Sequence, residues 1–247
     1  MSRLDRALGL ARSLAIYHGI PLRQRRLRRL YAQLTAPGDL VFDVGAHAGS
    51  RVRAFASLGC RVIAIEPQPD FAWLLRRLFA HQRRVEVVEA GVSDAVGRAS
   101  MSVSERMPTV TTLATPWRES RATEPDFARV QWNHRLEIPT TTLDALVERF
   151  GLPAFVKIDV EGAEPAVLAG LSRAVPAMSF EYLSRALDHV ESCLARLAAL
   201  GPYRYNWSAG ESYRFGSTEW LTGRELLEQI PVAAHAPRHG DVYARLT

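Results

Sequence analysis

Acidic side chains gather in this sequence at points where apolar runs end. The stretch "KIDVEGAEPAVLAG", from Lys157 to Gly170, places Asp159 directly after an apolar run and adds Glu161 and Glu164 shortly afterwards. A carboxylate in such a position can take a proton from an alcohol, which is the chemistry of a general base. The two glutamates also stand where a helix is expected to begin, and the helix dipole alone would favour acids there.

A second group, "VFDVGAHAGS" at 41 to 50, sets an acid and two glycines behind another apolar run. The glycines Gly45 and Gly49 allow a tight turn and a close approach of the backbone to a ligand. A pyrophosphate site requires G-x-G-x-x-G, whereas here Asp43 would repel that anion. The motif therefore favours a ligand with positive charge, and S-adenosylmethionine carries both a sulfonium and an ammonium group.

Two further apolar runs end in residues that suit the rest of a nucleoside. Glu66, followed by Pro67, can accept hydrogen bonds from both hydroxyls of a ribose, or it is a solvated carboxylate at a strand end. Gly91 opens the backbone after the third run. Asp94 could accept a hydrogen bond from the amino group of adenine, or it could be a turn residue ahead of Gly97.

Short apolar runs alternate with helical patterns along the chain, which predicts an α/β fold with a parallel sheet and crossover helices. The runs that we expect to be strands are 39–44, 61–66, 85–90, 154–159 and 177–182. The helices that we expect between them are 50–58, 70–81, 162–171 and 184–200. Because the carboxyl ends of parallel strands meet at one edge, the acids named above, together with Glu181, should gather there.

The stretch from 97 to 142 interrupts this alternation and is predicted to be an insertion. It starts with a hairpin-like segment at 98–104, continues irregularly, and ends in an extended segment at 135–142 that leads into a helix at Leu143. Long ordered loops are often functional. Near the C-terminus, 203–208 and 240–246 read as two strands around a short helix at 224–230. They fit an antiparallel edge hairpin that closes a doubly wound sheet.

The composition limits the class of protein. The 247 residues are 47% hydrophobic and 23% charged, which excludes a disordered or fibrous chain. Two cysteines, Cys60 and Cys193, give neither a disulfide framework nor a zinc site. No apolar run approaches the roughly 20 residues of a membrane span, and the N-terminus lacks the pattern of a signal peptide. We expect a cytoplasmic protein with an N-terminal extension at 1–38 and one domain at 39–247.

The net charge of +5 is concentrated in the extension, where "RQRRLRRLYAQL" holds five arginines between Arg23 and Leu34. This segment could contact phosphates or anionic lipid, and so allow peripheral membrane contact. It also reads as an amphipathic helix with a solvated basic face. The apolar residues at helical spacing are Leu22, Leu27, Leu30, Tyr31 and Leu34.

Several segments, taken in this order, resemble the FkbM-type family of S-adenosylmethionine-dependent methyltransferases. They are "VFDVGAHAGS", "VIAIEPQP", "VEVVEAGVSD", "TTLDAL", "FVKIDVEGAEPAVLAG" and "SFEYL", and the similarity covers about residues 39 to 185. The resemblance implies a class I, Rossmann-like methyltransferase fold: a seven-stranded, mostly parallel sheet with one antiparallel strand and helices on both faces.

The resemblance also implies O-methylation of a hydroxyl, with S-adenosylhomocysteine as the product of the cofactor. Asp43, Gly45 and Gly49 would hold the methionine part, and Glu66 the ribose. His47 stands where many members have Asn, so it either contacts the cofactor or fills the turn. The acceptor is expected to be a small molecule, a glycan or a glycolipid.

Methyl transfer to an alcohol requires a general base, and the sequence provides three candidates: Asp159, Glu181 and His134. Lys157 shares a strand face with Asp159, and it either tunes that carboxylate or simply pairs with an acid. Asp159, Glu161 and Glu181 have oxygens of the hard type that divalent cations take, but no spacing demands a metal.

Three other functions compete with this interpretation. A nucleotide-dependent oxidoreductase or epimerase would show G-x-G-x-x-G and a Tyr-x-x-x-Lys pair, and neither is present. A nucleic-acid base methyltransferase would show an Asn/Asp-Pro-Pro-aromatic motif where "DVEG" stands, so we expect no nucleic-acid partner. A silent adenosine-binding scaffold would keep the glycine turn but would not need the acids from Asp159 to Glu164.

Overall fold

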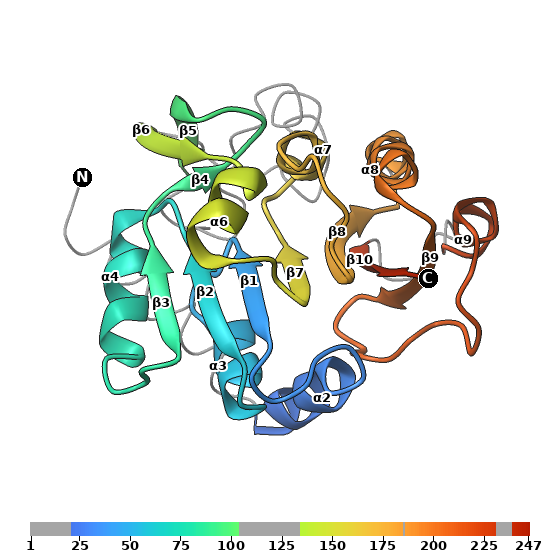
Figure 1. The fold of residues 1–247 in the computed structure, drawn as a ribbon, viewed down its shortest axis with the longest axis horizontal. Helices are drawn as coiled ribbons and strands as arrows, with labels where there is room; N and C mark the ends of the chain where they lie inside the picture. Colours follow the sequence, from blue (N-terminus) through green and yellow to red (C-terminus); the bar gives the residue numbers. More distant parts are fainter. Residues whose placement is uncertain (1–20, 104–133, 185, 231–238) are drawn as a thin grey trace.

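The computed structural model describes residues 21–103, 134–184, 186–230 and 239–247. Within them, seven strands form one sheet in the order β3-β2-β1-β7-β8-β10-β9 (Figure 1). The strands are β1 (Leu40–Val44), β2 (Arg61–Ile65), β3 (Val85–Val88), β7 (Phe155–Ile158), β8 (Ala177–Leu183), β9 (Tyr203–Ala209) and β10 (His239–Leu246). Neighbours pair in parallel except β10, which is antiparallel to both β8 and β9.

Helices cover both faces of this sheet, and the alternation of apolar residues along the strands explains how. In β1, Val41 packs in the same cluster as residues of α2, α3 and α4. Its neighbour Phe42 faces the opposite way and packs with residues of α6, α7, α8 and α9. The helices are α2 (Pro21–Tyr31), α3 (Ser50–Ser57), α4 (Pro69–Leu78), α6 (Leu143–Phe150), α7 (Glu164–Ala169), α8 (Leu187–Leu200) and α9 (Gly223–Gln229).

This architecture confirms the predicted fold, a seven-stranded, mostly parallel sheet with one antiparallel strand and helices on both faces. The strand order reverses at β1, which has β2 on one side and β7 on the other. Loops that leave the two sides of such a reversal diverge and open a crevice at the carboxyl ends of the strands. The site predicted from the sequence falls at this point.

The last strand lies inside the sheet. β9 and β10 pair antiparallel, as expected for the two late strands, but β10 inserts between β8 and β9, which makes β9 the edge. Val242, Tyr243 and Ala244 of β10 are all buried, because helices cover both sides of the strand. The C-terminal residues therefore belong to the core, and β10 reaches the neighbourhood of the predicted site.

A second, smaller sheet is formed by β4 (Gly91–Val92), β5 (Gly97–Val103) and β6 (His134–Thr141), in the order β4-β6-β5. It lies at the end of the main sheet toward which β1 and β2 point (Figure 1). The described part of the segment read as hairpin-like, 98–103, instead belongs to the single strand β5, and its antiparallel partner β6 follows much later in the chain. Pairing between distant segments leaves no local sequence signal, which explains the error.

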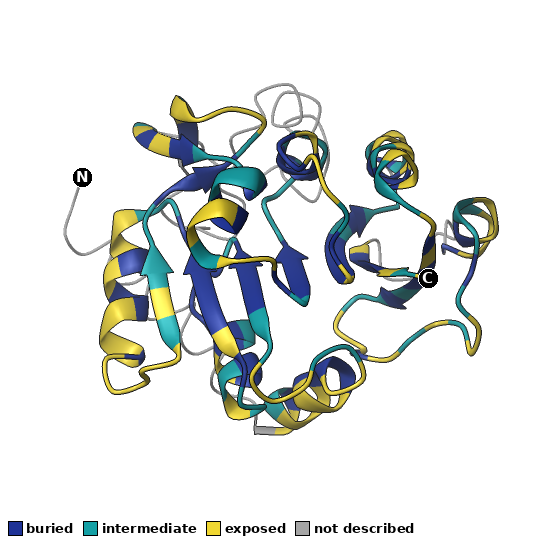
Figure 2. Ribbon diagram, in the orientation of Figure 1, coloured by how far each residue is buried: buried dark blue, intermediate teal, exposed yellow. Residues whose placement is uncertain are grey.

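The arginine-rich helix α2 packs on the main body of the protein. Leu27, Leu30 and Tyr31 are buried against α3, and the rings of Tyr31 and Phe55 lie 4.2 Å apart. Leu22 does not join this apolar face and is 61% exposed. Figure 2 shows the exposed outer side of α2 beside its buried inner side.

No helix among the described residues is long and apolar enough to cross a membrane.

Candidate active site

A pocket with an empty volume of about 810 Å³, open solvent included, lies at the crevice between the ends of β1, β2 and β7. Its wall is made by the loops after these strands, by the start of α3, and by β4 and β5 of the small sheet. Five of the residues predicted to hold a cofactor line it, namely Gly45, His47, Glu66, Pro67 and Gly91. The sequence pieces that are far apart in the chain thus meet around one cavity.

The two glycines of the first loop are needed for contacts within the protein. Gly45 has φ +81°, and a Cβ atom on it would lie 1.9 Å from the backbone oxygen of Asp159. Gly49 has φ +77°, and its Cβ would lie 2.8 Å from side-chain atoms of Leu75 and Phe79 on and beside α4. Gly45 therefore lets the loops after β1 and β7 touch, and Gly49 lets α3 begin close to α4.

His47 holds the shape of the loop between these glycines. It has φ 46°, a left-handed conformation that His and Asn adopt more readily than most residues. Its backbone N–H donates a hydrogen bond of 2.8 Å to Oε2 of Glu66, and its ring packs on Phe71 with 4.0 Å between the ring centroids. Burial lowers the pKa of His47 to about 4, so the ring is neutral near pH 7.

Glu66 is fixed at the end of β2 by two backbone donors. Oε2 accepts from His47 and Oε1 accepts from the backbone N–H of Gln68 at 2.9 Å. The side chain is buried but lines the pocket. Burial raises the pKa of Glu66 to about 7, although the two backbone hydrogen bonds oppose the shift. Each carboxylate oxygen has a second lone pair, so Glu66 can still accept hydrogen bonds from the hydroxyl groups of a ligand.

Asp43 lies behind the lining of the pocket and is fully buried. Within the described residues, neither of its carboxylate oxygens makes a hydrogen bond of normal geometry. Burial raises the pKa of Asp43 to about 6, while the charges of Arg51 and Lys157 oppose this rise. An acid in such surroundings is costly for the folded protein, which is typical of a residue kept for a ligand.

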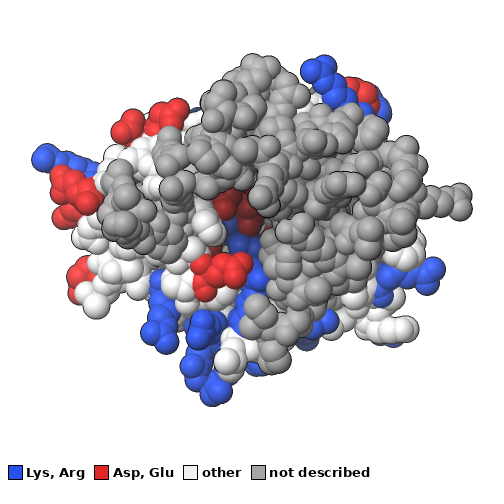
Figure 3. Space-filling view, turned by 180° about the vertical axis from the view of Figure 1, so that it is seen from behind, with Lys and Arg blue, Asp and Glu red and all other residues white. Residues whose placement is uncertain are grey.

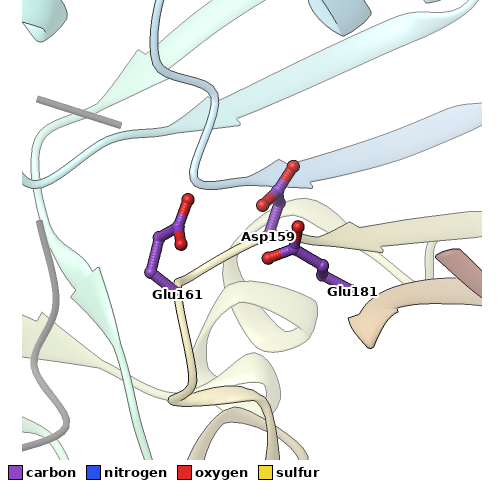
Figure 4. Close-up of side chains that lie close together, drawn as sticks. All are labelled: Asp159, Glu161 and Glu181. Atoms are coloured by element: carbon purple, nitrogen blue, oxygen red, sulfur yellow. The ribbon is translucent and has the colours of Figure 1, made fainter. Parts of the chain in front are cut away.

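Asp159, Glu161 and Glu181 bring their carboxyl groups together beside the pocket (Figure 4). One oxygen from each lies within 4.8 Å of the others. Asp159 and Glu161 follow β7 and line the pocket, whereas Glu181 comes from β8. Glu161 has φ 55°, a strained conformation for a glutamate of the kind that occurs at functional sites.

The charges around this cluster shift the pKa of Asp159 in the opposite direction from the pKa values of the two glutamates. Arg51 Nη2 lies 3.2 Å and Lys157 Nζ lies 3.6 Å from Oδ2 of Asp159. Burial alone would raise the pKa of Asp159, but Lys157 and Arg51 lower it below its usual value. Burial and the neighbouring acids raise the pKa of both Glu161 and Glu181 well above the usual value. Asp159 is therefore ionised, and the glutamates bind protons more readily.

Lys157 connects this cluster to the last strand. The ammonium group is fully buried and donates to Oδ1 of Asp241 at 2.7 Å and to the carbonyl of Ile158 at 3.0 Å. The other carboxylate oxygen of Asp241 accepts from the Tyr243 hydroxyl at 3.3 Å. Burial would lower the pKa of Lys157, but Asp159 and Asp241 raise it, so the ammonium group stays charged. Asp241 also stands opposite Glu181 in the register of β8 and β10.

Arg51 and Asp241 were missed in the sequence analysis, although each left a signal. Arg51 is a cation in the first turn of α3, where the helix dipole disfavours positive charge. Asp241 is an acid within a strand whose following residues are apolar. A charge placed against the local preference of its element indicates a partner elsewhere in the fold.

The structure places the remaining predicted residues outside the pocket wall or outside its description. Asp94 is exposed, accepts from the Ser93 hydroxyl at 3.1 Å, and does not line the pocket. His134 begins β6, but its side chain lies outside the described part, as do residues 104–133 of the insertion. Glu164 is buried at the start of α7 and accepts from the backbone N–H of Val160 at 3.1 Å.

Figure 3 shows a hollow in the back of the molecule in which acidic and basic side chains adjoin. Of the acid cluster, Asp159 and Glu161 line the pocket, and Glu181 lies beside them.

Comparison with known proteins gives a family and a relative that matches over a short segment. The family described as "Methyltransferase FkbM domain" matches residues 43–200. An ornithine lipid N-methyltransferase of Singulisphaera acidiphila is 41% identical over 58 residues, which are 22% of this chain. The match spans only 30% of that protein's length.

Solved structures with a similar fold include two methyltransferases. One is a precorrin-6y C5,15-methyltransferase from Geobacter metallireducens, with a TM-score of 0.45, 15% identity, and coverage of 91% of this chain and 87% of that one. The other is described as a putative O-methyltransferase from Klebsiella pneumoniae, with a TM-score of 0.45, 10% identity, and coverage of 96% and 89%.

Proposed function

The chain belongs to the methyltransferase FkbM domain family, and from this premise we propose that it is an O-methyltransferase that acts on a hydroxyl group. Membership of the family makes it an S-adenosylmethionine-dependent methyltransferase. It also removes the reason to consider an oxidoreductase or an epimerase. The atom that receives the methyl group and the identity of the acceptor are the parts that we propose.

The observation that carries the proposal is the shared wall between the pocket and the acid cluster. Asp159 and Glu161 line the pocket, and Glu181 lies within 4.8 Å of both. Methyl transfer is an in-line displacement, in which the sulfonium carbon and the acceptor oxygen must approach to about 3 to 3.5 Å. An acceptor hydroxyl that meets the methyl group at this wall has carboxylates within reach to take its proton.

We assign the cofactor to the pocket at the ends of β1, β2 and β7, which β4 also lines. Gly45, His47 and Gly49 shape the loop for the methionine part, and Glu66 with Pro67 faces the ribose. The buried charge of Asp43 favours the positively charged groups of the cofactor. Gly91 belongs to the adenine side, and the role of Asp94 at the adenine amino group stays a prediction, since Asp94 does not line the pocket.

Glu181 is the general base in this proposal. A base works best when its pKa lies near the working pH, and the pKa of Glu181 is raised by burial and by its acidic neighbours. Asp159 is held ionised by Arg51 and Lys157, which suits it to orient the cluster and to balance the sulfonium charge. The proposal includes no metal, because two cations of the protein already accompany Asp159.

Methylation of an amine is the second candidate. Asp159 and Glu161 line the pocket with Glu181 beside them, and carboxyl groups can also accept hydrogen bonds from an amine. The relative that matches over 58 residues is named as an ornithine lipid N-methyltransferase. Both candidates use the same pocket, and they differ in the atom that receives the methyl group.

Two experiments in sequence test the proposal. Isothermal titration with S-adenosylhomocysteine should show micromolar binding, and NADH in a parallel cell should show none. A panel of sugar, glycolipid and small-molecule alcohols, with matched amines, should then yield a product methylated on oxygen. Product on amines alone would replace the first candidate by the second, and cofactor binding without turnover on the whole panel would favour a scaffold.

A further inference from the structure

The outer side of α2 carries positive charge that the protein does not balance. Arg25, Arg26, Arg28 and Arg29 are exposed on this side, opposite the leucines that pack on α3. The helix contains no acidic residue. Within the described part of the chain, none of the four forms an ion pair with an acid. Packing explains the inner side of α2 but gives no reason for four adjacent arginines outside.

Arginines also surround two surface hollows that lie beside α2. Arg25, Arg28 and Arg29 line the first, which has an empty volume of about 600 Å³, open solvent included. Arg26, Arg29 and Arg214 line the second, of about 690 Å³. Three arginine side chains thus border each hollow, and Arg29 belongs to both. Guanidinium groups bind phosphate oxygens in pairs, so the exposed arginines around these hollows suit phosphate groups that lie side by side on a surface.

The helix presents these arginines from a fixed position. Gln24 donates to the backbone and side-chain oxygens of Ser50, at the start of α3, with distances of 3.1 and 3.0 Å. Arg23 is buried and pairs with Glu211, beyond the end of β9. The start of α2 is therefore tied to the end of the molecule where the pocket opens. Leu22, one residue earlier than Arg23, is 61% exposed.

We infer that α2 docks the protein on an anionic lipid bilayer, with its arginines on lipid phosphates and Leu22 among the lipid chains. Basic residues on a helix attract anionic lipids, and an exposed apolar side chain beside them adds burial in the bilayer interface. The phosphates of a nucleic acid would bind the arginines equally well, but a nucleic acid provides no apolar environment for Leu22. The bilayer is therefore the partner that accounts for both features.

This surface bears on catalysis through its place in the molecule. Basic side chains gather along the lower part of the face on which the acidic hollow opens (Figure 3). Docking through α2 would bring that face toward the bilayer and limit the search for acceptors to lipids and lipid-linked glycans. This last step rests on the proposed function, whereas bilayer binding itself does not.

The inference is tested by sedimentation of the full chain with two kinds of vesicle. The protein should sediment with vesicles of phosphatidylcholine mixed with phosphatidylglycerol. It should stay in the supernatant with vesicles of phosphatidylcholine alone. Binding should weaken as sodium chloride is raised, because salt screens the attraction. A variant with Arg25→Gln, Arg28→Gln and Arg29→Gln should bind at least about tenfold more weakly. Leu22→Gln should weaken binding without changing its dependence on salt.

A matched control removes three exposed arginines from other elements, by Arg77→Gln, Arg135→Gln and Arg204→Gln on α4, β6 and β9. It has the same net charge as the α2 variant and should bind vesicles like the parent. An equal loss of vesicle binding in both variants would overturn the inference. So would a parent protein that does not bind the vesicles but binds duplex DNA. All variants should bind S-adenosylhomocysteine like the parent. Failure of that binding in the parent would count against the proposed function and leave the vesicle result standing.

Discussion

Lys157 on β7 and Asp241 on β10 form a buried ion pair of 2.7 Å between residues that stand 84 positions apart in the chain. β8 lies between the two strands, so the pair crosses the sheet beneath α2 and α3. Lys157 also lies 3.6 Å from Asp159, which lines the pocket. The last strand thus helps to set the charge at a site whose recognisable motifs all precede it.

Breaking this pair from one side should be strongly destabilising. Asp241→Asn leaves a fully buried ammonium group with one carboxylate fewer, and we expect the free energy of unfolding to fall by about 3 kcal/mol or more. The double variant Lys157→Met, Asp241→Leu should lose less, because it removes both charges. Urea denaturation of the parent, the single and the double variants measures the coupling. Additive losses would show that the two side chains do not stabilise each other.

Gly45 should tolerate no side chain. Gly45→Ala would place a Cβ 1.9 Å from the Asp159 carbonyl, so the loops after β1 and β7 must separate and the affinity for S-adenosylhomocysteine should be lost. Gly38→Ala is the matched control, since Gly38 has φ +94° and nothing lies within 4 Å of its Cβ. The control should cost only the backbone strain of about 1 kcal/mol and bind normally. Titration calorimetry and thermal melts distinguish the two.

Asp43→Asn should make the protein more stable and weaken its binding of the cofactor product. The carboxylate is buried and makes no hydrogen bond of normal geometry in the described structure, so removing its charge should raise the free energy of unfolding at pH 8 by roughly 1 kcal/mol or more. The affinity for S-adenosylhomocysteine should fall by at least about tenfold, since the positive ammonium group loses its counter-charge. A variant that is less stable than the parent, yet binds like it, would give Asp43 a structural role instead.

Glu66 should make the ligand-free protein less stable as the pH rises. Its pKa is about 7 in the folded protein and near the ordinary glutamate value when unfolded. The folded state therefore holds the extra proton, and the stability that this gives is complete below the unfolded pKa and lost as the pH passes 7. Between pH 6 and pH 8 the parent should lose roughly 1 kcal/mol more than Glu66→Gln. Equal pH slopes in denaturant titrations would mean that Glu66 is ionised throughout.

Glu181→Gln tests the assignment of the base. Turnover on an identified acceptor should fall by about 100- to 10,000-fold, the usual contribution of a general base, while affinity for S-adenosylhomocysteine stays within about twofold of the parent. Glu137→Gln, an exposed glutamate on β6, is the control and should leave both unchanged. The turnover of the parent should fall as the pH drops through the raised pKa of Glu181. Full activity in Glu181→Gln would move the role to Glu161 or Asp159.

The sequence by itself determined the sheet, its crossover helices and the end of the sheet at which the pocket lies. Strands such as 40–44 and 61–65 carry their signal locally, because apolar runs between turn residues need no distant information. The acids at strand ends could be assigned to one edge for the same reason, since parallel strands align their carboxyl ends. Gly45, His47, Glu66, Pro67 and Gly91 all line the pocket that this reasoning required.

Only the tertiary structure decided which charges meet. Arg51, Lys157 and Asp241 lie on three elements, and nothing local to any of them states that Lys157 pairs with an acid on the last strand. The separation of an ionised Asp159 from proton-binding glutamates follows from distances of a few ångströms across strands. Likewise, β5 found its partner in a strand far along the chain, and Leu22 was left outside the face that its spacing predicted. Spacing in sequence fixes periodicity and local turns, but Coulomb interactions and burial depend on distances that only the folded chain sets.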